Sequence, residues 1–181
     1  MKSLEEEIFN LPSERAFNTL ALRIFALQYQ TNKVYRKYCD CLNVKVNDVQ
    51  TLEEIPFLPI QFFKTTVVKS GEFIAEAIFK SSGTSGNRSS HQIKKLSLYE
   101  QSFLNTFRKF YGDPKDLAVL ALLPSYLEQG ESSLVYMCDR LIKKSAHPES
   151  GFFLYEHEKL IKALEILTQR KVPTLLIGVA Y

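Results

Sequence analysis

Apolar residues in the first seventy positions follow the spacing of amphipathic helices. Ser13 can cap a helix, and the residues after it repeat at intervals of three and four: Phe17, Leu20, Ala21 and Ile24. A second, shorter helix is predicted around Val34, Tyr35 and Tyr38. The pattern therefore predicts a helical segment over residues 1–70 that packs on the rest of the chain.

Residues 55–64 interrupt this helical pattern. They read Ile-Pro-Phe-Leu-Pro-Ile-Gln-Phe-Phe-Lys, with prolines at positions 56 and 59. Proline lacks an N–H and restricts the residue before it, so a regular helix cannot run through this segment. Its apolar and aromatic side chains indicate an extended path that is packed against another part of the protein.

From residue 75 the pattern changes to strands that alternate with helices. Residues 75–80 predict a strand, residues 81–90 a polar loop and residues 91–96 the returning strand of a hairpin. Ser97 and Glu100 have the spacing of a capping box for the next helix. The buried face of that helix is expected to carry Phe103, Leu104, Phe107 and Phe110.

The rest of the chain continues the alternation. Residues 117–123 are entirely apolar, as in a strand that is buried on both faces of a parallel sheet. Helices over 132–143 and 158–170 are predicted, the second with Leu160, Ile161, Leu164 and Leu167 inward, with strands over 151–155 and 173–181. The fold class is therefore α/β: a helical segment followed by a mostly parallel sheet layered with helices, over residues 71–181.

Composition and charge exclude several classes of protein. The 181 residues carry a formal net charge of +3, too weak and too scattered for a nucleic-acid partner. The apolar run at 117–123 is far shorter than the roughly 20 residues of a membrane span. Three cysteines and an acidic start without a signal peptide predict reduced thiols and a cytoplasmic location.

The loop at residues 81–90 is the best candidate for chemistry. It reads Ser-Ser-Gly-Thr-Ser-Gly-Asn-Arg-Ser-Ser. Glycines let backbone amides approach a ligand, hydroxyls suit phosphate oxygens and Arg88 adds a positive charge, so the loop can cradle an anion after a buried strand. The spacing fits neither a P-loop nor a nucleophile elbow. The alternative interpretation is a flexible Ser/Gly hairpin tip.

Three segments resemble a known family. Residues 79–86 are similar to the phosphate loop of the adenylate-forming enzymes. Residues 55–60 with 63–65, and residues 122–128 with 132–135, resemble the acyl-protein synthetases of the LuxE type, one branch of those enzymes.

The resemblance implies a reaction and a set of ligands. A carboxylic (fatty) acid would attack the α-phosphate of ATP in the presence of Mg²⁺, and the acyl group would pass to a thiol of a protein cysteine, CoA or a carrier protein. No catalytic residue and no metal ligand is assigned. The triphosphate would be bound by Ser81, Ser82, Gly83, Thr84, Ser85, Gly86 and Arg88.

The sequence departs from the family pattern at two points. A lysine is usual three residues after the last glycine of the loop, and here that position is Ser89; either Arg88 replaces it or the charge comes from elsewhere. The family's later motifs are expected beyond residue 181, so this chain is expected to be an N-terminal part, inactive alone. The alternative function is a truncated, non-catalytic module that binds nucleotide or an acyl ligand and acts through a partner.

Two further expectations concern the parallel sheet. Ser125 and Tyr126 follow the strand at 117–123, where they form either a wall of the acyl or carboxylate pocket or only a turn into the next helix. The last strand, over residues 173–181, is expected to lack a covering helix. Its exposed apolar surface would then favour self-association.

Overall fold

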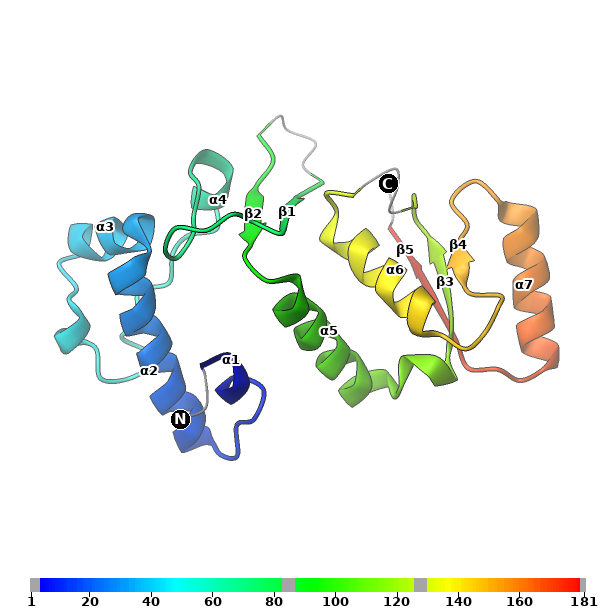
Figure 1. Cartoon of the computed structure of the whole chain (residues 1–181), viewed down its shortest axis with the longest axis horizontal. Helices are drawn as coiled ribbons and strands as arrows, with labels where there is room; N and C mark the ends of the chain where they lie inside the picture. The colour runs from blue at the N-terminus through cyan, green and yellow to red at the C-terminus, as the bar shows by residue number, and fades with distance from the viewer. Residues whose placement is uncertain (1–3, 83–86, 126–129, 180–181) are drawn as a thin grey trace. The chain divides into compact units, whose positions relative to one another are not determined.

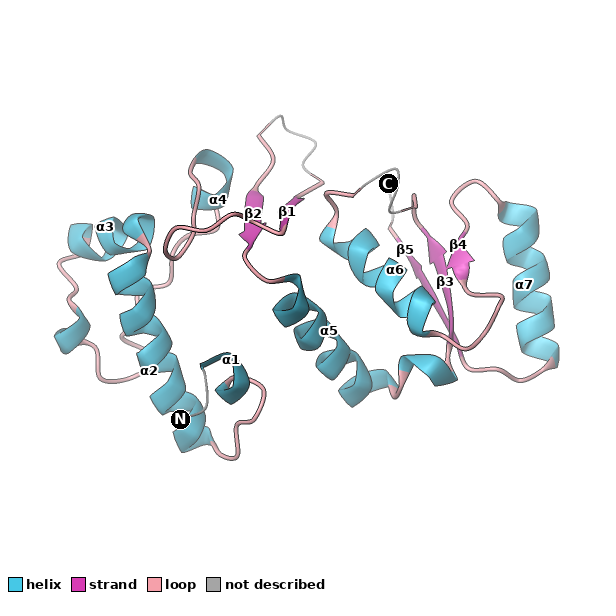
Figure 2. Ribbon diagram, viewed as in Figure 1, coloured by secondary structure: helices cyan, strands magenta, loops and turns pink. Residues whose placement is uncertain are grey.

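The computed structural model describes residues 4–82, 87–125 and 130–179 (Figures 1 and 2). The chain divides into two compact units, Met1–Leu98 and Tyr99–Tyr181. This division falls later in the chain than residue 70, and the domain boundary expected there stays a prediction.

Helices build the beginning of the first unit. After α1 (Leu4–Glu7), helix α2 (Glu14–Thr31) begins at Ser13, whose hydroxyl accepts the N–H of Ala16 at 3.2 Å. Helix α3 (Lys33–Cys41) follows after one residue, Asn32. Both helices predicted from the sequence are therefore confirmed.

The core of the first unit lies between these two helices and the segment that follows. Phe25 and Tyr35 meet edge to face, with ring centroids 6.1 Å apart, and Cys39 and Val49 complete the buried cluster. Val49 directly follows the short 3-10 helix η1 (Val46–Asp48).

The proline-containing segment is only partly as expected. Ile55 and Leu58 pack against the core, but Phe57 and Ile60 are 76% and 69% exposed. A single helical turn, α4 (Phe62–Thr65), begins three residues after Pro59. Proline disfavours helix at the residue before it and lacks its own N–H, so it does not prevent a helix that starts beyond both positions.

A hairpin and the start of a long helix close the first unit. Strands β1 (Ala77–Lys80) and β2 (Ser90–Ile93) pair antiparallel, which confirms the predicted hairpin. Helix α5 (Leu96–Tyr111) begins before Ser97, so the predicted capping box is wrong. The N–H of Leu96 instead donates to the carboxylate of Glu76 at 2.7 Å.

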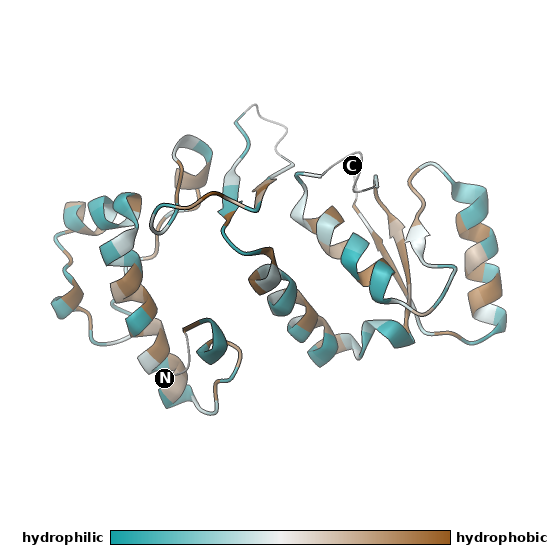
Figure 3. Cartoon of the chain, in the orientation of Figure 1, coloured by the Kyte–Doolittle hydropathy of each residue, from teal (hydrophilic) through white to brown (hydrophobic). Residues whose placement is uncertain are grey.

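The second unit is a parallel sheet between helices, which confirms the α/β class. Strand β3 (Ala118–Leu122) pairs on one side with β4 (Gly151–Phe152) and on the other with β5 (Thr174–Gly178). Strands β3 and β5 are mostly hydrophobic (Figure 3). Besides most of α5, the described helices of this unit are the 3-10 helix η2 (Pro114–Asp116), α6 (Ser133–Lys144) and α7 (His157–Gln169).

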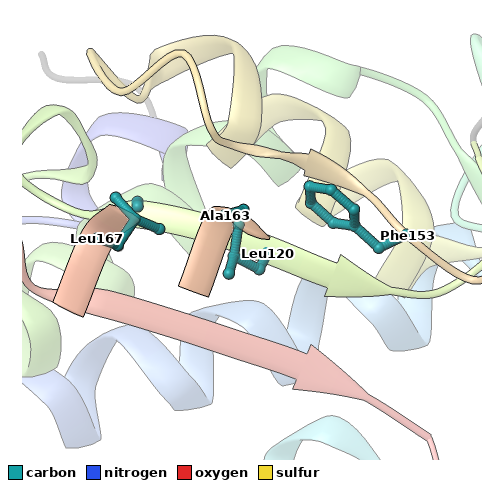
Figure 4. Packing of buried hydrophobic residues seen from close by; sticks show 5 residues of the cluster. Leu120, Phe153, Ala163 and Leu167 are labelled. Carbon is teal, nitrogen blue, oxygen red and sulfur yellow. The ribbon is translucent and has the colours of Figure 1, made fainter. Parts of the chain in front are cut away.

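Alternate residues of β3 build two cores. Ala118 and Leu120 pack with Phe153 and with Ala163 and Leu167 of α7 (Figure 4). Val119 packs with residues of α5 and α6, and Ala121 with residues of α6. Residues 118–121 are 0% exposed, so β3 is buried on both faces, as predicted.

Some apolar positions lie outside the cores to which the helical pattern assigned them. Phe110 of α5 is 71% exposed and Ile161 of α7 is 55% exposed. Both follow the helical spacing but lie outside the buried clusters of the described residues. Strand β5 lies at an edge of the described sheet, and its Leu176 is 51% exposed.

The first prediction compares two leucines that are paired across neighbouring strands, Leu120 and Leu176. Leu120→Ala should lower the free energy of unfolding by about 2–5 kcal/mol, because it leaves a cavity in a fully buried site. Leu176→Ala, the same change at a half-exposed site, should cost less than about 1 kcal/mol. Urea unfolding measures both, and equal losses would contradict the assigned burial.

The second prediction concerns the edge strand β5. Leu176 and Val179 are 51% and 42% exposed, and within the described sheet β5 pairs only with β3. We expect the purified chain to self-associate with rising concentration, and Leu176→Lys to weaken this because a charge opposes edge-to-edge pairing. Sedimentation velocity measures the effect; a wild-type chain that stays monomeric would refute it.

Candidate functional site

The polar loop begins and ends at a closed hairpin neck. The last pair of the two strands is Lys80 with Ser90. Beyond it, the N–H of Ser81 donates to the carbonyl of Ser89, and the N–H of Ser89 donates to the hydroxyl oxygen of Ser81, both at 3.0 Å. Ser82 is exposed beside this neck. The remaining loop residues predicted to bind phosphate, Gly83, Thr84, Ser85 and Gly86, lie outside the described residues.

Arg88 is the cation that the structure places at this neck. Its Nε donates to the carbonyl of Ser81 at 2.5 Å, while the side chain remains exposed. The structure therefore brings Ser81 and Arg88 together. A guanidinium at the entrance of a hydroxyl-rich loop suits an anionic ligand.

The position of the loop in the fold differs from the sequence-based expectation. The loop does not follow a strand of the parallel sheet; it joins the two strands of a separate antiparallel hairpin. Only Phe79 of β1 is buried, and Ile78 is 43% exposed. A strand with one covered face suits a hairpin, whereas a strand inside a parallel sheet needs apolar residues on both faces.

An aromatic contact supports the second strand of the hairpin. The imidazole of His91 meets the ring of Phe63 edge-on, with centroids 5.9 Å apart. His91 is exposed overall, but partial desolvation of its ring lowers the pKa below its ordinary value of 6.5, because the charged imidazolium loses hydration there. His91 is therefore neutral at neutral pH.

Ser125 lies in the second unit, after the carboxyl end of β3. Ser125 is half-buried and directly follows the buried residues Leu123 and Pro124 in the chain. Helix α6 begins shortly afterwards at Ser132, whose hydroxyl accepts the N–H of Val135 at 3.3 Å. Ligands of parallel sheets bind at the carboxyl ends of the strands, which suits Ser125 to the wall of a pocket. Its place just before α6 suits it equally to the turn into that helix. Tyr126 lies outside the described residues.

One polar cluster in the second unit was missed from the sequence. The hydroxyl of Tyr136 donates to Glu100 at 2.5 Å, and Arg140 Nε lies 2.9 Å from the same carboxylate. Arg140 also donates to the Tyr136 hydroxyl oxygen at 3.2 Å. Burial is the main cause that raises the pKa of Tyr136. The cluster ties α5 to α6; its only sequence signal was Glu100, which had been interpreted as half of a capping box.

Two of the three cysteines do not have the properties of nucleophiles. Cys39 and Cys138 are buried, and burial raises the pKa of Cys138 to about 11, so that it stays a thiol at neutral pH. Cys41 is exposed.

Among the described residues, no three His, Cys, Asp or Glu side chains are arranged to hold a metal ion. No helix in the same part of the chain has the length and apolar character needed to span a membrane.

Comparison with known proteins gives one family. The family described as "Acyl-protein synthetase, LuxE" matches residues 7–117, which include helices α2 and α3, the proline-containing segment and the hairpin loop. No curated protein and no solved structure matches the chain.

The third prediction concerns the contact between Phe63 and His91. Phe63→Ala should raise the pKa of His91 toward 6.5, because it returns water to the imidazole. Since the pKa of folded His91 is lowered, its contribution to hairpin stability is complete above about pH 6.5 and is lost as the pH falls through that value toward the folded pKa. NMR titration of the imidazole measures the shift, with His157 as an internal control; an unchanged pKa would disprove the proposed cause.

Proposed function

The chain belongs to the acyl-protein synthetase family, LuxE, and on this premise we propose that it takes part in the ATP-dependent activation of a carboxylic acid and its transfer to a thiol. The observation that supports this most directly is the hydroxyl- and glycine-rich loop, held at a hydrogen-bonded neck with the Arg88 guanidinium on the Ser81 carbonyl. The matched residues 7–117 contain this loop.

The proposed reaction has two steps. In the first, a carboxylate oxygen of the acid attacks the α-phosphorus of ATP; the bond to the β,γ-diphosphate breaks, and acyl-adenylate and pyrophosphate form. In the second, a thiolate attacks the acyl carbon and AMP leaves with the electron pair of the broken bond. The acceptor thiol belongs to a protein cysteine, CoA or a carrier protein.

The loop would stabilise the charge that develops on pyrophosphate. The hydroxyl hydrogen of Ser81 and the amides and hydroxyls of Ser82 and residues 83–86 are suitable donors, and Arg88 supplies the positive charge. The Ser81 amide itself is used in the neck, where it donates to the Ser89 carbonyl. Mg²⁺, when bound, would offset the charge of the phosphates.

The experiment is ATP–pyrophosphate exchange by the intact gene product with a panel of carboxylic acids. Exchange that depends on an acid supports the proposal. ATP binding without exchange under any acid would overturn it and favour the alternative, a non-catalytic nucleotide- or acyl-binding module.

The fourth prediction places the loop in this reaction. Thr84→Ala should lower the exchange rate by roughly 10- to 150-fold, because it removes one hydroxyl donor to a charged oxygen, a contact worth about 1.5–3 kcal/mol. If the contact strengthens as pyrophosphate leaves, the loss should fall on kcat rather than on KM for ATP. Gly83→Val should be at least as damaging, since a side chain would intrude between the amides and the phosphate.

Two comparisons complete this test. Thr168→Ala, at an exposed position of α7, is the control and should leave the rate unchanged. Arg88→Ala should cost more than Thr84→Ala if this arginine replaces the missing lysine. Unaltered turnover in both Gly83→Val and Thr84→Ala would show that the loop is only a hairpin tip.

A further inference from the structure

A large apolar cavity lies in the first unit, away from the polar loop. It has a volume of about 540 Å³, within the usual range of small-molecule sites. One wall is a face of α2 and the other is the segment from Leu52 to Val68. Its apolar lining includes Phe17, Ala21, Ile24, Ile55, Leu58 and Phe63.

Two polar atoms of residues that line this cavity, on Gln28 and Asn32, already make hydrogen bonds within the protein. Gln28 Oε1 accepts the hydroxyl of Ser70 at 2.5 Å, and Asn32 Oδ1 accepts the N–H of Tyr35 at 3.1 Å. No charged side chain lines the cavity. An occupant would therefore have an uncharged, apolar body, with any polar end group outside.

The cavity is open to solvent on one side and is therefore an apolar groove rather than a closed void. Its apolar walls lack the close contacts that a packed interior would provide. Phe17 and Phe57 in its lining are 49% and 76% exposed, which leaves a costly apolar surface in water. A bound apolar chain would cover both the cavity and these rings.

We propose that this cavity binds the unbranched alkyl chain of a fatty acid. The class of ligand rests on the proposed function, in which the substrate is a carboxylic acid; the location rests on the cavity alone. It places the alkyl chain in the first unit rather than beside Ser125.

A single ring connects the cavity to the hairpin. Phe63 lines the cavity, and its ring meets His91 at 5.9 Å between centroids. His91 pairs across the hairpin with Phe79, two residues before Ser81 at the loop neck. A chain that fills the cavity contacts Phe63 and so changes the surroundings of His91.

The test measures binding of octanoate, decanoate, dodecanoate and tetradecanoate to the 181-residue chain by calorimetry, without ATP. Each added methylene should tighten binding by about twofold to fourfold, because burial of one methylene is worth at most about 0.8 kcal/mol, until the cavity is full. The imidazole signals of His91 should shift on binding, whereas those of His157 should not.

Matched variants on one helix locate the site. Ala21→Phe fills the cavity and should weaken tetradecanoate binding by at least roughly tenfold, as when two or more methylenes lose their place. Ala26→Phe is the same change on α2 outside the cavity lining and should stay within about twofold. Circular dichroism checks that both variants are folded.

A measurement on the wild-type chain keeps the test independent of folding in the variants. A tetradecanoic acid that carries a diazirine at its far end should label peptides from α2 and from the segment between Leu52 and Val68. Affinity that does not depend on chain length, equal loss in Ala21→Phe and Ala26→Phe, or label elsewhere would overturn the proposal. Because no step needs ATP, it can fail while pyrophosphate exchange succeeds, or succeed while exchange fails.

Discussion

Asn32 organises the first unit, because this one buried residue ends one helix through its backbone and begins the next through its side chain. Its backbone N–H donates to the carbonyl of Gln28 at 2.8 Å in the last turn of α2, and its side chain caps α3. The residue is 5% exposed, so these bonds are shielded from water and costly to break. The abrupt turn brings Phe25 against Tyr35. The neighbouring face of α2 is left to line the cavity.

Local signals were enough to predict most elements of the fold. Ser13 and Ser132 cap the helices that they were expected to begin, and the apolar run at 117–123 is the buried central strand. Each depends on contacts a few residues away in sequence or on simple burial. The same patterns cannot specify which side chains from distant segments meet. Phe110 shows this, since its helical spacing is correct but nothing covers it.

The residues of the candidate site were predicted from composition and resemblance, but the sheet to which they belong was not. The hydroxyl- and glycine-rich loop was found because ligand-binding loops need those residue types. The hairpin was predicted correctly, but its separation from the parallel sheet was not, because short strands do not encode which further strands they join. The cavity was missed for a similar reason. The spacing of Phe17, Ala21 and Ile24 predicts an apolar helix face, but only the tertiary structure shows that this face borders a cavity.

The hydrogen bond between Arg88 and the Ser81 carbonyl fixes the orientation of the guanidinium group at the loop neck. Guanidinium is a flat fork, and a bond at its Nε sets the plane in which the other nitrogens lie. An ammonium in the lysine position of related loops is a compact charge with no such plane. In the proposed site, an incoming phosphate would therefore meet a guanidinium whose plane is already fixed. Part of the side-chain entropy of Arg88 is lost in the free protein, so less is lost when the phosphate binds.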